Sequence, residues 1–227
     1  MINFTKERVK SPSKLKIKNK LGLTKFFVVG FLVAVSVFFF ANPSQAEAAT
    51  LYAKTAGGNW SAAGTWSNTG SGGGDSSGPP TAADNVIFET GSGNVTIDSG
   101  AVCRSLDTNS GTGNYAGTIT HNAITFIIGD ATAGAGNTAL DLSNGTYTKV
   151  NATTSAITFA STSGTVQTVT TAGNNMGAMN FNGIGGSWQL ADALTVNSGT
   201  TLTLTNGTLD TNGQTVAAGG MTLAAGG

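Results

Sequence analysis

The sequence predicts an all-β fold, a right-handed parallel β-helix that follows an N-terminal export signal. Three observations predict it: short runs of alternating apolar and polar residues, a composition rich in threonine and glycine, and apolar pairs that recur about every 22 residues. The first two observations also fit an antiparallel β-sandwich, which is therefore the alternative.

Residues 1–48 have the layout of a secretory signal peptide. Eight of the eleven basic residues lie within positions 1–25, and a largely apolar run follows at 26–41. Ser44, Ala46 and Ala48 then alternate with larger polar residues. Cleavage after Ala46 or after Ala48 therefore fits the small-x-small pattern. We place the cleavage after Ala48 and keep Ala46 as the alternative. This signal predicts a protein that is secreted or displayed on the cell surface.

The alternative for this segment is an uncleaved N-terminal helix that anchors the chain in a membrane. A spanning helix needs about 20 apolar residues, with a lower limit of about 17. The run at 26–41 is shorter than that and ends in small residues, which favours cleavage. Contact with a membrane is therefore expected only through the N-terminal signal.

The charge of the chain after the signal excludes two classes of partner. Only Lys54, Arg104 and Lys149 are basic beyond residue 48, against nine acidic residues, so residues 49–227 carry a net charge of −6. Binding of nucleic acid depends on clustered lysine and arginine, as does binding of acidic lipid headgroups by a basic patch. Neither partner is expected.

A single cysteine, Cys103, rules out a disulfide within the chain. We expect this side chain to act as a small buried hydrophobe, because free cysteine is among the most buried residue types. The segment 49–227 that follows the signal is long enough for one domain with a sizeable core.

The strands are predicted from short apolar-polar-apolar runs. Residues 49–227 contain 33 threonines and 31 glycines, which favour strands and turns respectively. The runs are 86–88, 95–97, 119–120, 124–128, 140–142, 157–159, 179–181, 194–196, 202–204 and 221–223. Asn-Gly pairs that predict turns lie at 144–145, 182–183, 206–207 and 212–213.

The recurrence of apolar pairs about every 22 residues favours the β-helix over the sandwich. Three tracks of apolar residues carry the period: Ile157/Phe159, Met179/Phe181 and Leu202/Leu204; Val166/Val169, Trp188/Leu190 and Leu209; Leu194/Val196 and Val216. Three short strands per repeat are what one coil of a parallel β-helix needs, and each coil buries its inward side chains only when other coils stack on it.

The domain organisation follows from this pattern. Residues 1–48 are the signal, 49–98 an N-terminal cap with the first strands, and 99–227 the β-solenoid repeats. The pattern reaches Gly227 without the cap that a solenoid needs at its end. We therefore expect the chain to be truncated at the C-terminus, with some functional parts beyond it.

The sequence offers no convincing catalytic residue, metal ligand set or cofactor site, and we predict that the protein is not an enzyme. The only histidine, His121, is expected to be a solvated turn residue. The aspartates are interpreted as turn residues, and Gly72–Asp75 is a single echo of calcium-binding repeats. A polysaccharide lyase or hydrolase is the least favoured function, since it would need clustered aspartates beside Arg104 or Lys149.

Two tryptophans, Trp60 and Trp66, are the candidate binding residues. Aromatic rings at this close spacing can stack on sugar rings, which would make a polysaccharide or a cell-surface glycan the partner. The alternative, which we favour, is that both rings cap the first coil, because a solenoid needs an apolar plug at its end. Trp188 lies on a repeat track and is expected in the core.

Residues 59–98 resemble the opening of the eight-glycine domain. The resemblance rests on Trp-Ser at 60–61, Thr-Trp at 65–66, the prolines at 79–80, and the phrases at 84–88 and 95–98. That domain occurs in some extracellular and hyaluronan-related proteins and implies a β-helix-like fold. The glycine-rich insertion at 70–78 departs from the family pattern.

The remainder, Ile157 through Leu223, resembles bacterial β-strand-repeat surface proteins, including autotransporter passenger domains. Phrases such as those at 168–173, 181–183 and 202–210 are typical of these families. The resemblance implies surface display, adhesion or scaffolding. The expected function is an exported structural or stalk module without catalysis, and the alternative is an adhesin module that binds polysaccharide.

Overall fold

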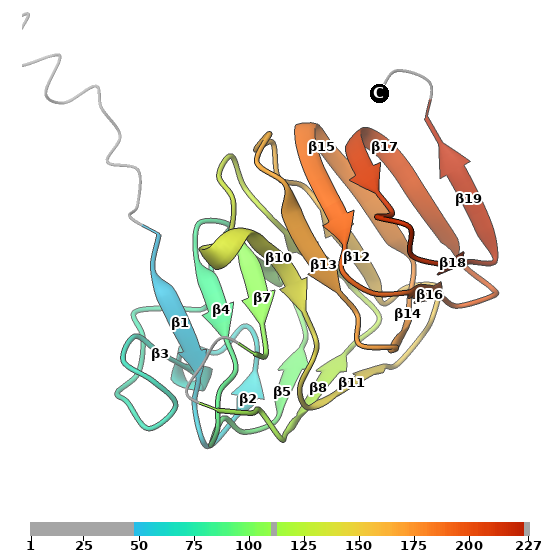
Figure 1. Ribbon diagram of the computed structural model, residues 1–227. Helices are drawn as coiled ribbons and strands as arrows, with labels where there is room; N and C mark the ends of the chain where they lie inside the picture. Colours follow the sequence, from blue (N-terminus) through green and yellow to red (C-terminus); the bar gives the residue numbers. More distant parts are fainter. Residues whose placement is uncertain (1–47, 110–112, 225–227) are drawn as a thin grey trace, which may run out of the picture. The chain divides into compact units, whose positions relative to one another are not determined.

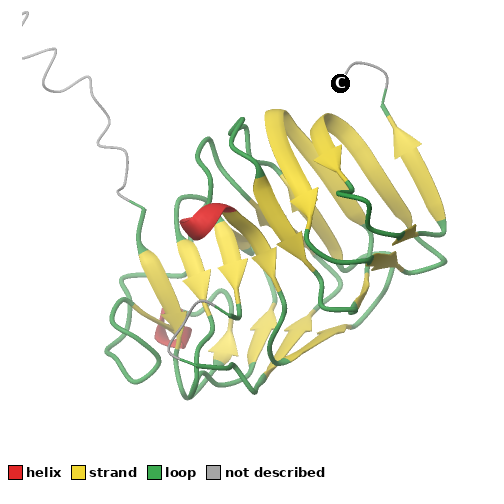
Figure 2. Cartoon of the chain, in the orientation of Figure 1, coloured by secondary structure: helices red, strands yellow, loops and turns green. Residues whose placement is uncertain are grey.

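The computed structural model describes residues 48–109 and 113–224, and this part of the chain is built almost entirely of strands and turns (Figures 1 and 2). Apart from Ala48, the predicted export segment lies outside the described residues. Two single-turn 3₁₀ helices, η1 (Ala63–Thr65) and η2 (Ala135–Asn137), are the helical elements of the described part. No helix within it is long and apolar enough to cross a membrane.

The strands follow one another around three faces, so that the chain winds as a parallel β-helix. The first face consists of β1 (Thr50–Ala53), β4 (Asn85–Ile87), β7 (Ser105–Asp107), β10 (Thr138–Asp141), β13 (Gln167–Thr170) and the C-terminal parts of β15 (Met179–Leu190) and β17 (Thr201–Asp210). The second face consists of β2 (Gly58–Asn59), β5 (Val95–Ile97), β8 (Thr118–His121) and β11 (Thr146–Lys149), and later of β14 (Asn175–Met176), β16 (Leu194–Val196) and β18 (Val216–Ala217). The third face consists of β6 (Val102–Cys103), β9 (Thr125–Ile128), β12 (Ala156–Phe159), the N-terminal parts of β15 and β17, and β19 (Gly220–Leu223).

The pairing confirms the parallel arrangement and excludes the sandwich. Successive strands on each face pair in parallel, as in β12 with β15 and β15 with β17. Among the described strands the one antiparallel pair joins β1 to β3 (Trp66–Ser67), at the edge of the first face. A sandwich would need antiparallel neighbours throughout, so the alternative prediction is wrong.

The register confirms the predicted period in the C-terminal coils. Phe159 pairs with Phe181, and Phe181 pairs with Leu204, as the first predicted track requires. On the first face, Trp188 pairs with Leu209, and Leu194 pairs with Val216 on the second. The three predicted tracks are therefore the inward rows of the three faces. Val166, which begins the second track, lies just outside β13 and is 46% exposed.

Two strands turn the corner between the third and first faces without a break, and glycine makes this possible. Both β15 and β17 contain a glycine at the bend, and Gly207 has a φ of 88°. A Cβ on Gly207 would lie 2.6 Å from the carbonyl oxygen of Gly186. No other residue type fits this position without displacing the coil below it.

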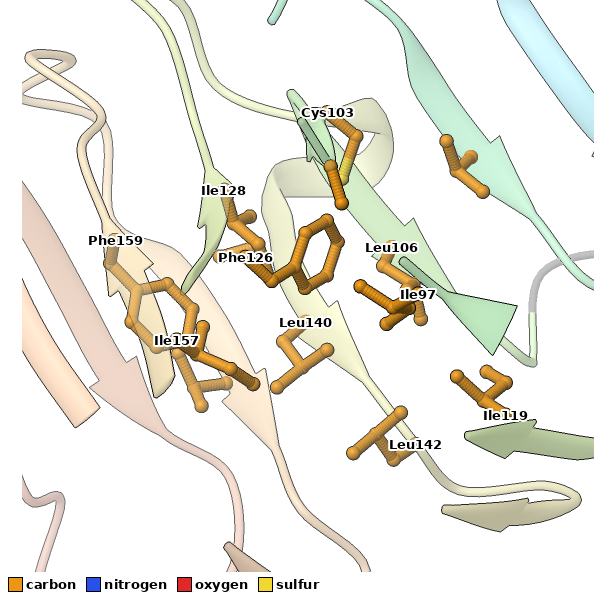
Figure 3. Packing of buried hydrophobic residues seen from close by; sticks show 14 of the residues in the cluster. Ile97, Cys103, Leu106, Ile119, Phe126, Ile128, Leu140, Leu142, Ile157 and Phe159 are labelled. Carbon is orange, nitrogen blue, oxygen red and sulfur yellow. The ribbon is translucent and has the colours of Figure 1, made fainter. Parts of the chain in front are cut away.

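The core is a column of apolar side chains enclosed by the three faces (Figure 3). Strand alternation places every second side chain inward, so residues in register stack on one another along the column. The rings of Phe159 and Phe181 stack with centroids 4.6 Å apart and an interplanar angle of 7°. Trp188, which is fully buried as predicted, packs against both rings.

Candidate functional site

A row of polar side chains runs along the outward side of the third face. Thr158, Asn180, Thr203 and Thr222 are consecutive register partners in β12, β15, β17 and β19. In β12, β15 and β17 the flanking side chains turn inward, which leaves Thr158, Asn180 and Thr203 on the outward side. Thr222 continues the row in β19, where the flanking Met221 and Leu223 are themselves exposed. Each is at least partly exposed, and the strand spacing of about 4.8 Å repeats along the row. We call these four residues the threonine row.

A shallow groove of about 280 Å³ lies at this row. Its lining includes Asn180, Thr200, Thr201 and Thr203 from neighbouring coils. The hydroxyl of Thr205 donates a hydrogen bond of 2.8 Å to Oδ1 of Asn180, which fixes the orientation of the amide. Hydroxyl and amide groups without a charge can exchange hydrogen bonds with the hydroxyls of a sugar. They supply no acid or base for a reaction.

The two candidate binding residues, Trp60 and Trp66, are buried, with exposed fractions of 1% and 0%. Their rings contact each other edge to face at 4.8 Å, and Trp60 also contacts Phe126 of β9. The indole N–H of Trp66 donates a hydrogen bond of 2.8 Å to the carbonyl of Trp60. Neither ring presents a face on which a sugar could stack. They fill the interior next to the first coil, where the described chain has no strand on the third face.

The segment that carries these tryptophans is held across the first coils by a carboxylate. Asp98, which follows β5, accepts hydrogen bonds from the N–H and hydroxyl of Ser61 at 2.9 and 2.6 Å. Burial raises the pKa of Asp98, but the hydrogen bonds from Ser61, together with main-chain hydrogen bonds from Asp98 and Ser99, outweigh this and leave the pKa below its ordinary value. The sequence interpretation of Asp98 as an ordinary turn residue missed this contact, because Ser61 is 37 positions away.

The remaining aspartates are spread over the described chain and mainly close turns. Several carboxylates accept a hydrogen bond from the N–H two residues later, as predicted for turn residues. These are Asp107, Asp130, Asp141 and Asp210. Asp107 and Asp141 are register partners on the first face, and the described residues contain no group of three or more ligands that could hold a metal ion.

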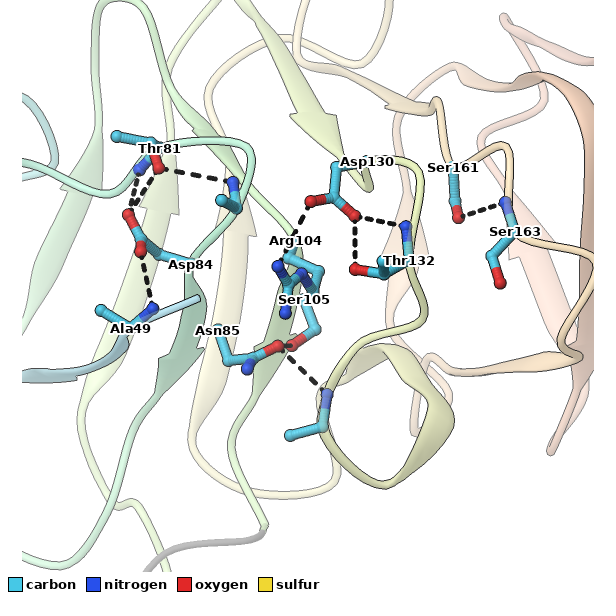
Figure 4. A network of polar contacts seen from close by, with 12 residues as sticks. Ala49, Thr81, Asp84, Asn85, Arg104, Ser105, Asp130, Thr132, Ser161 and Ser163 are labelled. Carbon is cyan, nitrogen blue, oxygen red and sulfur yellow. Dashed lines mark hydrogen bonds and ion pairs between the residues drawn. The ribbon is translucent and has the colours of Figure 1, made fainter. Parts of the chain in front are cut away.

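None of the three basic side chains of the described residues lies beside a cluster of carboxylates; Figure 4 shows Arg104 beside the single carboxylate of Asp130. Arg104 forms an ion pair with Asp130 at 3.3 Å, and the ammonium group of Lys149 donates to the carbonyl of Asn175. Lys54 pairs with Asp75 near the surface. The arrangement that a lyase would need, clustered aspartates beside Arg104 or Lys149, is thus not found in residues 48–109 and 113–224.

His121 lies in β8 and is fully buried, so the prediction of a solvated turn residue is wrong. Strand alternation continues from Ile119 to His121 and turns the imidazole inward. Nε2 lies 3.0 Å from the carbonyl of Ile124, which only accepts, so this nitrogen carries the proton. Nδ1 then accepts from the hydroxyl of Tyr147 at 2.7 Å. Burial lowers the pKa of His121 to about 4, which keeps the ring neutral.

Cys103 is fully buried in β6, as predicted for a small hydrophobe (Figure 3). Burial raises the pKa of the thiol well above its ordinary value, and the negative charge of Asp84 raises it further. A thiol held in its neutral form inside the core is a poor nucleophile.

A hollow of about 560 Å³ lies beside the N-terminal end of β1. Residues that line it include Ala49, Leu51, Pro79, Pro80, Asp84 and Val102.

Comparison of the chain with known protein families, with curated proteins and with solved structures finds no match.

Proposed function

We propose that this chain is an exported structural module, a β-helical stalk or scaffold displayed on a bacterial cell surface, and that it has no catalytic activity. The observation that carries the proposal is the continuous parallel ladder, which runs along the first face from β1 through β17. A stacked β-helix is extended and stiff along its axis, since each coil is bonded to the next by main-chain hydrogen bonds.

The use of polar side chains supports the same proposal. The charged groups described above close turns, clamp loops or pair singly, and the only histidine is neutral and buried. Catalysis needs paired groups with accessible reacting atoms. The N-terminal signal-like layout supports export, and the resemblance to β-strand-repeat surface proteins supports display.

Export and display are tested by producing the full chain with a C-terminal epitope tag in a bacterium with a general secretory pathway. We expect the tag in the extracellular or surface fraction, where added protease removes it from intact cells. Retention of the whole population in the cytoplasm would contradict the proposal. A precursor in which the apolar run at 26–41 is interrupted by two lysines is the matched control.

A second candidate function, binding of an insoluble polysaccharide, is favoured by the threonine row. Hydroxyl and amide groups repeat there from strand to strand along the outward side of the third face, which suits a repeating, uncharged polymer. The exported protein is incubated with a panel of insoluble polysaccharides, with and without calcium. Selective retention that is lost in Thr158→Val/Thr203→Val would support binding, with Thr96→Val/Thr148→Val on the second face as the control. Equal retention of both variants would contradict a role for the row.

A further inference from the structure

The carboxylate of Asp84 is held at the point where the predicted signal ends (Figure 4). Oδ1 accepts a hydrogen bond from the main-chain nitrogen of Ala49 at 3.1 Å. Oδ2 accepts from the N–H and the hydroxyl of Thr81, at 2.8 and 2.7 Å. Asp84 is only 8% exposed, so its charge is largely removed from water.

No described side chain supplies a positive charge to this carboxylate. The two ion pairs of the described residues are Lys54 with Asp75 and Arg104 with Asp130, and the thiol of Cys103 is neutral. The three donors to Asp84 named above are all neutral groups. Burying an ionised carboxylate without a cation is unfavourable, and buried charges in proteins are normally paired.

Cleavage of the signal would create the missing cation at the required atom. Hydrolysis after Ala48 adds the oxygen of water to the carbonyl carbon of Ala48 and releases the nitrogen of Ala49 as an amine. That amine has an ordinary pKa of about 7.7–8.0 and takes up a proton at neutral pH. Cleavage after Ala46 would instead leave a neutral amide at Ala49.

We propose that a signal peptidase cuts the chain between Ala48 and Ala49, and that the new α-ammonium group forms an ion pair with Asp84. The inference rests on the proposed export of the chain. Ala48 is exposed, whereas Ala49 already lies against the fold, so the cut falls at the border of the β-helix.

Both members of the pair are positioned by the main chain. The carbonyl of Ala49 accepts from the N–H of Asn85 at 2.9 Å, and the carbonyl of Asp84 accepts from the N–H of Arg104 at 2.8 Å. The nitrogen of Ala49 therefore stays beside the carboxylate whether or not it is charged. The adjacent hollow leaves space for water around the other hydrogens of the ammonium group. Cleavage of the signal thus adds an ion pair that holds the start of β1 against Asp84, at the start of the second coil.

The first experiment measures the N-terminus of the protein exported from the full-length precursor, by intact mass and N-terminal sequencing. We expect a single species that begins at Ala49. An exported species that begins at Glu47, or at any other residue, would overturn the inference and leave export intact. A full-length chain confined to the cytoplasm would overturn export itself, so the two failures are distinguishable.

The second experiment measures the ion pair by a double-mutant cycle on thermal unfolding. In the exported protein, Asp84→Asn is expected to lower the Tm by about 5 °C. The exposed Asp75→Asn is the control and should have little effect. Ala48→Leu removes the small residue that cleavage after position 48 requires, so that Ala49 keeps an amide nitrogen. In that background Asp84→Asn should lower the Tm much less, and an equal loss in both would show that no ion pair forms.

Discussion

The C-terminal coils, residues 156–224, and the N-terminal coils, residues 49–149, build the same three-faced helix in different ways. In the C-terminal coils, register partners recur at a nearly constant step along the chain, and β15 and β17 bend around a corner unbroken. In the N-terminal coils the step from Leu106 to its partner Leu140 is much longer, because loops leave the faces between strands. Paired tryptophans and side-chain carboxylates there add contacts to the strand ladder, as in Trp60 with Trp66 and Asp98 with Ser61. The parallel ladder thus tolerates variable loops when other groups anchor them.

The largest effect is expected from removing the aromatic plug of the N-terminal coils. Trp66→Ala deletes a fully buried ring that contacts Trp60 and Phe88, and we expect a loss of about 4 kcal/mol in the free energy of unfolding. Urea unfolding measures it. A loss below about 1 kcal/mol would mean that the plug is dispensable and that the ladder alone holds these coils.

The second-largest effect is expected from acid, which should lower the free energy of unfolding through His121 of the N-terminal coils. The pKa of His121 falls from 6.5 in the unfolded chain to about 4 in the folded chain, so the unfolded state binds the extra proton between these values. The stability that this group contributes is complete above pH 6.5 and is lost as the pH falls to 4, by about 3 kcal/mol. Unfolding measured from pH 7 to 4 tests this. In His121→Gln the loss over this window should largely disappear; an unchanged loss would assign it to other groups.

Two glycines of the C-terminal coils, Gly207 and Gly213, both have a positive φ, and their substitution tests why the corner at Gly207 needs glycine. Gly207→Ala places a methyl group against the carbonyl of Gly186, whereas a Cβ on Gly213 would meet nothing within 4 Å. We expect Gly207→Ala to cost about 3 kcal/mol and Gly213→Ala about 1 kcal/mol in the free energy of unfolding. Equal losses would show that backbone strain, and not the close stacking of coils, sets the requirement for glycine.

The smallest effect is expected from a surface amide pair in the same coils. Asn206 donates a hydrogen bond of 2.7 Å to the side chain of Asn182, and both are solvent-exposed or nearly so. Asn206→Ala should lower the free energy of unfolding by about 0.5 kcal/mol, because water replaces the lost partner. A loss above about 1.5 kcal/mol in urea unfolding would show that stacked amides hold the coils together, as the core does.

Much of the fold could be predicted because strand alternation is local. Each of the ten predicted apolar runs overlaps a strand, as for Val95–Ile97 and Leu194–Val196. Strands with weak apolar patterns were missed, including β7 and β11, whose sequences are Ser-Leu-Asp and Thr-Tyr-Thr-Lys. Pairing with neighbouring coils makes these segments strands, and a single sequence does not display that pairing.

The candidate site was less predictable, because its residues meet across coils. The threonine row joins residues that lie one whole coil apart in the sequence, and it becomes visible only when the register is known. Trp60 and Trp66 carry the same sequence signal for sugar stacking as for core packing. Their burial, which depends on Phe126 and Phe88 from later coils, distinguishes the two.

The all-β class, the repeat period and the inward rows of the C-terminal coils could be read from the amino-acid sequence, because these features depend on local alternation and its repetition. The burial of His121, and the position of Asp84 beside the nitrogen of Ala49, 35 positions earlier, follow from the folded coils. The physical reason is that stacking of coils brings distant residues to the spacing of adjacent strands, and the irregular loops of the N-terminal coils hide that spacing from the sequence.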